Sequence, residues 1–127
     1  MKLTKNFSKS EFNSKDGAEM PFDVLQNVQK LANQLQVIRD YINSSITVNS
    51  GYRSPSHNRN VGGQRDSQHL LGKAADIKTT VMMPNELAAV IEQLINDGHI
   101  LQGGLGIYNT FVHYDIRKTK ARWDFRR

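Results

Sequence analysis

The sequence predicts an α+β fold in which helices pack on one side of a small antiparallel sheet. The expected elements follow the order helix, strand, strand, helix and two further strands, without the strand–helix alternation of a doubly wound fold. A short turn near Asn109 joins the last two strands, as in an antiparallel hairpin. The chain has 127 residues, which is the size of one domain that buries a core without disulfides. We therefore expect residues 1–127 to form a single domain.

The first part of the chain is predicted to be mainly helical. Ser8 and Glu11 have the spacing of a capping box, so a short helical turn starts there. Pro21 opens a long helix that ends by residues 43–45. Apolar residues recur in this helix every three or four positions, which lays one stripe against a core. These residues are Val24, Val28, Leu31, Leu35, Ile38 and Ile42.

The second part alternates short strands with one more helix. Residues 46–49 are mainly β-branched and suit a strand, and residues 74–80 suit another. Pro84 starts a second helix, for which Gly98 is the stop signal. The hairpin strands are expected at residues 103–108 and 111–117.

The most informative stretch is SGYRSPSHNRNVGGQRDSQHLLGKAAD, residues 50–76, where no long apolar period exists. Within it, Gly72 separates His69 from Asp76, so a turn at the glycine can bring both side chains onto one ion. A histidine nitrogen and a carboxylate oxygen suit zinc. The chain contains no cysteine, so histidine and carboxylate are its only strong ligands for a transition metal.

A third ligand is predicted in the segment FVHYDIR near the C-terminus. Strand alternation places His113, Asp115 and Arg117 on one face. The opposite, apolar face carries Val112, Tyr114 and Ile116. A His, Asp, His set leaves one tetrahedral position open, as in catalytic zinc sites. We therefore predict one zinc ion per chain, held by His69, Asp76 and His113.

These residues lie in motifs that resemble the zinc D-Ala-D-Ala carboxypeptidase family, peptidase family M15. The pattern S-x-H-x-x-G-x-A-x-D occupies residues 67–76, SGYRS occupies 50–54, and G-x-Y followed by V-H-x-D occupies 106–115. FSKSEF at residues 7–12 resembles the usual beginning of the family. The motifs span more than half the chain and are similar to the short M15 branch that includes phage endolysins. This resemblance implies an α+β fold and a zinc peptidase activity.

The resemblance also implies roles for residues beside the metal. Arg53 in SGYRS is predicted to hold a substrate carboxylate or the polarised carbonyl, for which a planar guanidinium is well suited. Ser67 is expected to orient the His69 loop and, with Tyr108, to contact substrate. His57 is a candidate for a substrate contact or for a supporting role behind the ligands. Trp123 is expected in the core, with the groove as the alternative.

The general base is the position at which this sequence departs from the family. Many M15 enzymes carry an acid three residues before the last zinc histidine, and related peptidases carry a histidine two before it. Here those positions hold Thr110 and Phe111. Asp115 shares a strand face with His113 and is our candidate catalytic base, and the alternative is that it orients His113 as a hydrogen-bond acceptor.

The sequence therefore predicts a zinc-dependent peptidase that hydrolyses an amide bond in peptidoglycan stem peptides or cross-links, with peptidoglycan as its partner. A non-catalytic zinc-stabilised cell-wall-binding or virion structural module is the alternative. No secretory signal follows Met1, so we expect synthesis in the cytoplasm and release to the cell wall by another factor, as for a phage or prophage endolysin. We expect a monomer.

The charge of the chain restricts its partners only weakly. Seventeen basic and twelve acidic residues give a formal charge of +5, which attracts polyanions of several kinds. Basic residues cluster after residue 117, and we expect these residues to form a solvated tail. No recognition helix or stacking pattern accompanies them, so we expect no nucleic-acid partner. No apolar run approaches the roughly 18 residues of a membrane span.

Overall fold

The structure, a computed structural model, describes all 127 residues and combines helices with one five-stranded sheet. The α-helices are α1 (Phe22–Ile42), α2 (Pro55–Asn60) and α3 (Pro84–Asn96), and two 3₁₀ turns are η1 (Lys9–Phe12) and η2 (Gln68–Leu71). The strands are β1 (Thr47–Ser50), β2 (Ala74–Lys78), β3 (Gly104–Ile107), β4 (Val112–Asp115) and β5 (Ala121–Asp124). This confirms the predicted α+β class.

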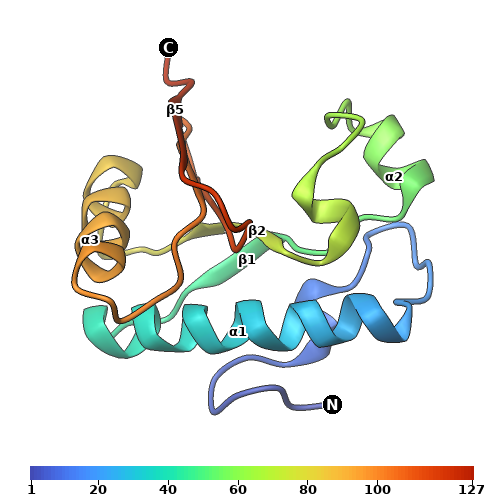
Figure 1. Ribbon diagram of the computed structural model, residues 1–127, viewed down its shortest axis with the longest axis horizontal. Helices are drawn as coiled ribbons and strands as arrows, with labels where there is room; N and C mark the ends of the chain where they lie inside the picture. Colours follow the sequence, from blue (N-terminus) through green and yellow to red (C-terminus); the bar gives the residue numbers. More distant parts are fainter.

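The long helix α1 lies along one side of the sheet, and α3 stands beside the C-terminal strands (Figure 1). The predicted apolar stripe of α1 is confirmed, because Val28, Leu31 and Leu35 are fully buried in the core. Asn43 ends α1 in the left-handed conformation with φ of 51°. At the N-terminus, the capping box of Ser8 and Glu11 forms as expected and begins η1.

The sheet has the strand order β1-β2-β4-β3-β5. Neighbours from β1 to β3 are antiparallel, and β3 and β4 form the expected hairpin. The last pair, β3 and β5, is parallel, so the sheet is mixed rather than purely antiparallel. Val112 and Tyr114 of β4 point into the core, as the alternation of FVHYDIR predicted.

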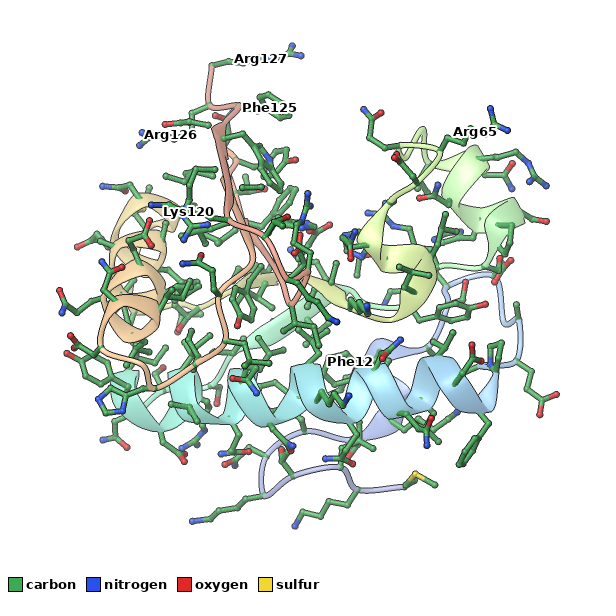
Figure 2. All side chains as sticks on the ribbon, in the orientation of Figure 1. Phe12, Arg65, Lys120, Phe125, Arg126 and Arg127 are labelled. Atoms are coloured by element: carbon green, nitrogen blue, oxygen red, sulfur yellow. The ribbon has the colours of Figure 1, made fainter.

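The expected solvated tail is wrong in part, because residues 121–124 form the edge strand β5. Arg122 is held there by Glu92 of α3 at 2.7 Å and donates to the carbonyl of Gly103 at 2.6 Å. The lysines and the last two arginines of this segment are exposed, and Figure 2 shows Arg126 and Arg127 at the projecting C-terminal end, whereas Phe12 lies within the body of the protein.

A second difference lies between Ser50 and the strand that begins at Ala74, where no helix was predicted. Residues 55–60 form the short helix α2, because Ser54 caps its N-terminus by accepting from the backbone N–H of His57 and Pro55 occupies the first turn. No helix of the structure combines the length and apolar character that a membrane crossing requires.

Candidate metal centre

One row of residues crosses the whole sheet and carries the site. Ser50 of β1 pairs with Asp76 of β2, Asp76 with His113 of β4, His113 with Gly106 of β3, and Gly106 with Trp123 of β5. Directly paired residues present their side chains on the same face of a sheet. The row therefore places a carboxylate, an imidazole and an indole side by side on one face.

The three predicted ligands meet at this row: Asp76 and His113 belong to it, and His69 comes from η2. The Oδ1 atom of Asp76 lies 3.1 Å from Nδ1 of His113 and 3.3 Å from Nε2 of His69. One donor atom from each of the three residues lies within 4.8 Å of the others, and all three residues are buried. The group can therefore hold a metal ion, and its two nitrogens and one oxygen suit zinc.

The His69 ring is oriented with a free nitrogen toward Asp76. Its Nδ1 lies 2.7 Å from the carbonyl oxygen of Gly51, which can only accept, so Nδ1 carries the proton and Nε2 is left with a lone pair. The backbone N–H of His69 donates to Oγ of Ser67, which caps η2. This hydrogen bond holds Ser67 at the start of the turn that carries His69.

The loop that carries His69 is fitted closely to α1. Gly72 ends η2 in the left-handed region with φ of 73°. A side chain at this position would meet Val24 and Val28 of α1 at less than 3 Å. Only glycine satisfies both the backbone conformation and this contact, and it allows the chain to turn directly into β2 and Asp76.

The His113 ring is oriented by Asp115. Its Nε2 donates to Oδ2 of Asp115 at 2.7 Å, which leaves Nδ1 facing Asp76. Asp115 is fully buried and also accepts from the backbone N–H of Gly104 and from the guanidinium of Arg117. Its oxygens are therefore fully engaged, and this geometry is that of a carboxylate that orients a ligand histidine.

The charges at the site favour a cation between the ligands. Burial would raise the pKa of Asp76, but the imidazole groups of His113 and His69 beside its carboxylate outweigh burial and hold this pKa well below its usual range. Burial would lower the pKa of His113, but its bonds to Asp115 and Asp76 raise it. Two imidazole lone pairs aimed at one carboxylate oxygen repel unless a proton or a metal ion lies between them, so the residues present fit a bound zinc ion.

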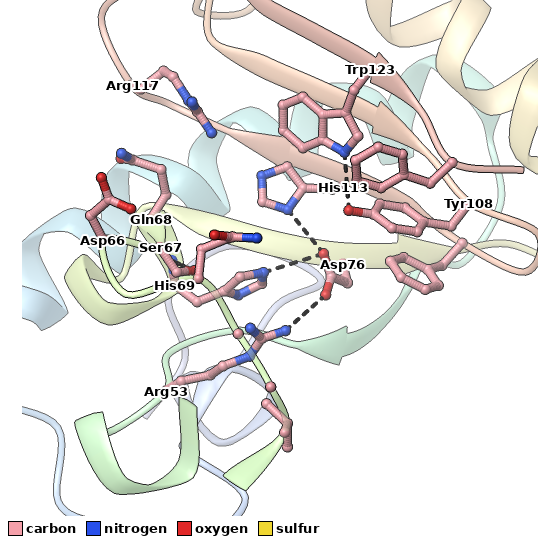
Figure 3. Close-up of a pocket in the computed structure, with 16 residues that line it drawn as sticks. Arg53, Asp66, Ser67, Gln68, His69, Asp76, Tyr108, His113, Arg117 and Trp123 are labelled. Atoms are coloured by element: carbon pink, nitrogen blue, oxygen red, sulfur yellow. Dashed lines mark hydrogen bonds and ion pairs between the residues drawn. The ribbon is translucent and has the colours of Figure 1, made fainter. Parts of the chain in front are cut away.

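Arg53 both supports the site through hydrogen bonds and lines the pocket. It donates to Ser50 at 3.1 Å, to Asn58 at 3.2 Å and to Oδ2 of Asp76 at 3.2 Å. Its backbone N–H bonds the carbonyl of His69. The guanidinium therefore fixes Asp76 with Oδ1 toward the histidines, and it also lines the pocket (Figure 3).

The cluster lies in a pocket of about 700 Å³, a size that accommodates a small ligand or a short peptide. One wall is aromatic and consists of Tyr108, Phe111, Trp123 and Phe125. The expectation that Trp123 belongs to the core is wrong. It lies in the pocket because its ring packs against His113, with centroids 5.0 Å apart, and beneath the guanidinium of Arg117.

The other sequence-predicted residues divide between the pocket and its surroundings. Ser67 and Tyr108 line the pocket, whereas His57 lies on α2 and is not among the lining residues. Two further carboxylates were not among the site residues predicted from the sequence. Asp66 is an exposed carboxylate that lines the pocket. Asp16 accepts hydrogen bonds from the hydroxyls of Ser14 and Ser54 and so ties the N-terminal segment to the start of α2.

Comparison with known proteins defines the class of protein. Residues 5–115 match the family Peptidase M15, so the chain belongs to this peptidase family. Over 45 residues it is 47% identical to the zinc D-Ala-D-Ala carboxypeptidase of Streptomyces albus G. This alignment covers 35% of the chain and 18% of that carboxypeptidase. The fold, the His-Asp-His cluster and the family together define an M15 peptidase domain with a site able to bind zinc.

Proposed function

We propose that the protein is a zinc-dependent peptidase that hydrolyses an amide bond in peptidoglycan stem peptides or cross-links. The observation that carries the proposal is the convergence of His69, Asp76 and His113 at the base of the pocket. Zinc bound by these residues would polarise the scissile carbonyl and activate a water molecule. The carboxypeptidase relative, which is named for a D-Ala-D-Ala bond, supports a substrate of this class.

The residues around the cluster suit an anionic peptide. Arg53 and Arg117 line the pocket on different sides of the ligands, and a guanidinium binds a carboxylate by two parallel hydrogen bonds. Stem peptides carry free carboxylates, and the formal charge of +5 attracts an anionic wall polymer. Arg53 would bind a substrate carboxylate or the carbonyl oxygen, and the aromatic wall would exclude water from one side of the bond.

We propose a phage or prophage endolysin, released to the wall by another factor, as the biological setting of this activity. We further propose that the domain acts as a monomer with one zinc ion per chain. Carboxypeptidase and endopeptidase action differ in whether the bond cut is the last of the stem peptide, and the products distinguish them.

One observation favours a second candidate function, a zinc-stabilised wall-binding or virion module without turnover. Asp115 is buried and its oxygens are engaged by His113, Gly104 and Arg117, and positions 110 and 111 carry no acid. Asp66 is then the pocket carboxylate left to accept a proton. A protein that binds walls in the presence of zinc without releasing new termini would support this second candidate.

The test is digestion of purified peptidoglycan followed by mass spectrometry of the soluble products. We expect new amino and carboxyl termini with zinc, none after treatment with a chelator, and recovery when zinc is restored. His69→Ala is the inactive control. The same fragments in the presence of chelator would overturn the proposal, and the masses of the fragments identify the bond.

A further inference from the structure

The hydroxyl group of Tyr108 is held in the pocket with its own hydrogen free. Nε1 of Trp123 lies 3.0 Å from Oη of Tyr108. An indole N–H can only donate, so the tyrosine oxygen is the acceptor in this bond. The hydroxyl hydrogen of Tyr108 therefore remains available to a ligand. Figure 3 shows this hydroxyl at the end of the ring that faces His113 and Asp76.

The ring of Tyr108 is fixed on its faces by two other aromatic residues. Phe111 stacks on it with centroids 4.4 Å apart and planes 10° apart, and Phe125 meets it edge-on at 5.6 Å. The backbone N–H of Tyr108 bonds the carbonyl of Phe111 and closes the hairpin turn. Rotation of the hydroxyl is the freedom that remains, and the Trp123 bond restricts it.

Trp123 reaches Tyr108 because its strand neighbour has no side chain. Gly106 lies between His113 and Trp123 in the cross-sheet row, and a side chain at this position would collide with the indole. The indole instead crosses over Gly106 and packs against His113. Trp123 thus connects a metal-ligand candidate with the hydroxyl of Tyr108, and it does so from β5, beyond the residues that match the family.

The two guanidinium groups near the cluster each use part of their N–H groups within the protein. Arg53 donates to Ser50, Asn58 and Asp76, and Arg117 donates to Asp115. A carbonyl oxygen that gains negative charge needs a donor that does not first have to break such a bond. The Tyr108 hydroxyl meets this requirement.

Resting on the proposed peptidase function, we propose that Tyr108 is a catalytic residue that donates a hydrogen bond to the carbonyl oxygen of the scissile amide as the oxygen becomes negatively charged. Tyr108 keeps its proton throughout, so no bond to hydrogen is broken in this step. Trp123 is the positioning residue, because its N–H occupies one lone pair of the Tyr108 oxygen and directs the hydrogen toward the substrate.

The kinetic test compares Tyr108→Phe, Trp123→Phe and the double variant with zinc saturating. We expect Tyr108→Phe to lower kcat about 10²-fold, the usual effect of losing one oxyanion donor, with KM nearly unchanged. Trp123→Phe should lower kcat by less, about 10-fold, and the double variant should be no slower than Tyr108→Phe alone because both changes affect one hydrogen bond. Tyr41→Phe, which alters an exposed tyrosine of α1, is the control with wild-type kinetics.

A second readout does not depend on turnover. The chain has one tryptophan, so its indole N–H gives one resonance in a nitrogen-15 correlation spectrum. Tyr108→Phe should shift this resonance and Tyr41→Phe should leave it in place. Calorimetry with a phosphinic dipeptide, which mimics the charged oxygen, should show about 10²-fold weaker binding to Tyr108→Phe than to the wild-type protein.

The results separate this proposal from the peptidase function itself. A wild-type kcat, or a wild-type affinity for the phosphinate, in Tyr108→Phe would overturn the Tyr108 assignment and leave the peptidase function standing. Additive losses in the double variant would overturn the positioning role of Trp123. A wild-type protein that cuts no peptidoglycan amide would overturn the peptidase function, while the phosphinate comparison would still decide the role of Tyr108.

Discussion

The Oδ2 atom of Asp115 lies 2.7 Å from Nε2 of His113, on the side of the imidazole opposite the other ligand candidates. This bond decides which nitrogen of His113 is free for a metal. It also separates the two roles that the sequence left open for Asp115, because a carboxylate behind the ring supports the ligand but does not face the pocket. The geometry favours the supporting role.

Asp115→Asn tests this assignment directly. If Asp115 orients His113, the change should weaken zinc binding by about 10-fold to 100-fold, and saturating zinc should restore much of the activity. Asp124→Asn is a matched control, because Asp124 pairs with Arg126 two residues later just as Asp115 pairs with Arg117, but on an exposed site. Normal zinc affinity combined with a rate loss of about 10²-fold or more would instead identify Asp115 as the base.

Gly104→Ala should disturb the same bond without changing any polar group. A Cβ atom at this position would collide with the carboxylate of Asp115. We expect the variant to bind zinc at least several-fold more weakly and to melt at a lower temperature, because overpacking of a buried site costs about 1–3 kcal/mol. Gly17→Ala is the comparison for zinc affinity, which should stay at the wild-type value because a Cβ there meets no neighbouring atom; its left-handed backbone should lower the melting temperature of that variant as well. Unchanged zinc affinity in Gly104→Ala would contradict the close packing of β3 on Asp115.

The lowered pKa of Asp16 predicts how the stability of the fold changes at acid pH. Hydrogen bonds from Ser54 and Ser14 lower the pKa of Asp16 from 3.8 to about 2. Because the folded-state pKa is depressed, its contribution to stability is present above pH 3.8 and is lost as the pH falls toward 2. Urea denaturation of wild type and Asp16→Asn from pH 5 to pH 2 should therefore give a difference that shrinks over this range. A difference that is constant with pH would show that the carboxylate charge has no part in it.

Arg122→Ala should weaken the attachment of β5 to α3 and to the chain at Gly103. The guanidinium bonds Glu92 of α3 through two nitrogens and also bonds the carbonyl of Gly103. We expect a loss of about 1–2 kcal/mol in the free energy of unfolding, given the partial exposure of the pair. Lys118→Ala, which removes an exposed charge of the same sign, should change stability little. Equal stabilities of the two variants would indicate that this segment is a solvated tail, as its composition suggested, and not a packed strand.

Local patterns predicted the parts of the fold that depend on nearby residues. The apolar spacing in α1, the Ser8 capping box and the strand alternation around His113 are each written in a few consecutive positions. They predicted helices and the hairpin, and the motifs around His69, Asp76 and His113 predicted the cluster. Asp76 and His113 could be assigned to the same metal site from the sequence because each lies in a recognisable motif.

The remainder depends on contacts between segments that are distant in sequence. β5 has only four residues and lies within a basic segment, and its pairing with β3 depends on Glu92 and on the absence of a side chain at Gly106. The sequence left both the core and the groove open for Trp123, and the register of β5 is what places its ring over Gly106. The role of Asp115 likewise depended on a hydrogen-bond partner that spacing alone does not select.

The measurement that tests the account most directly is calorimetric titration of the metal-free protein with zinc. We predict one zinc ion per chain for the wild-type protein and an affinity at least about 10²-fold lower for His69→Ala, because a ligand itself is removed. His99→Ala, which removes an exposed imidazole, should titrate like the wild-type protein. A wild-type protein that binds no zinc, or a His69→Ala variant that binds it with wild-type affinity, would contradict the assignment of the site.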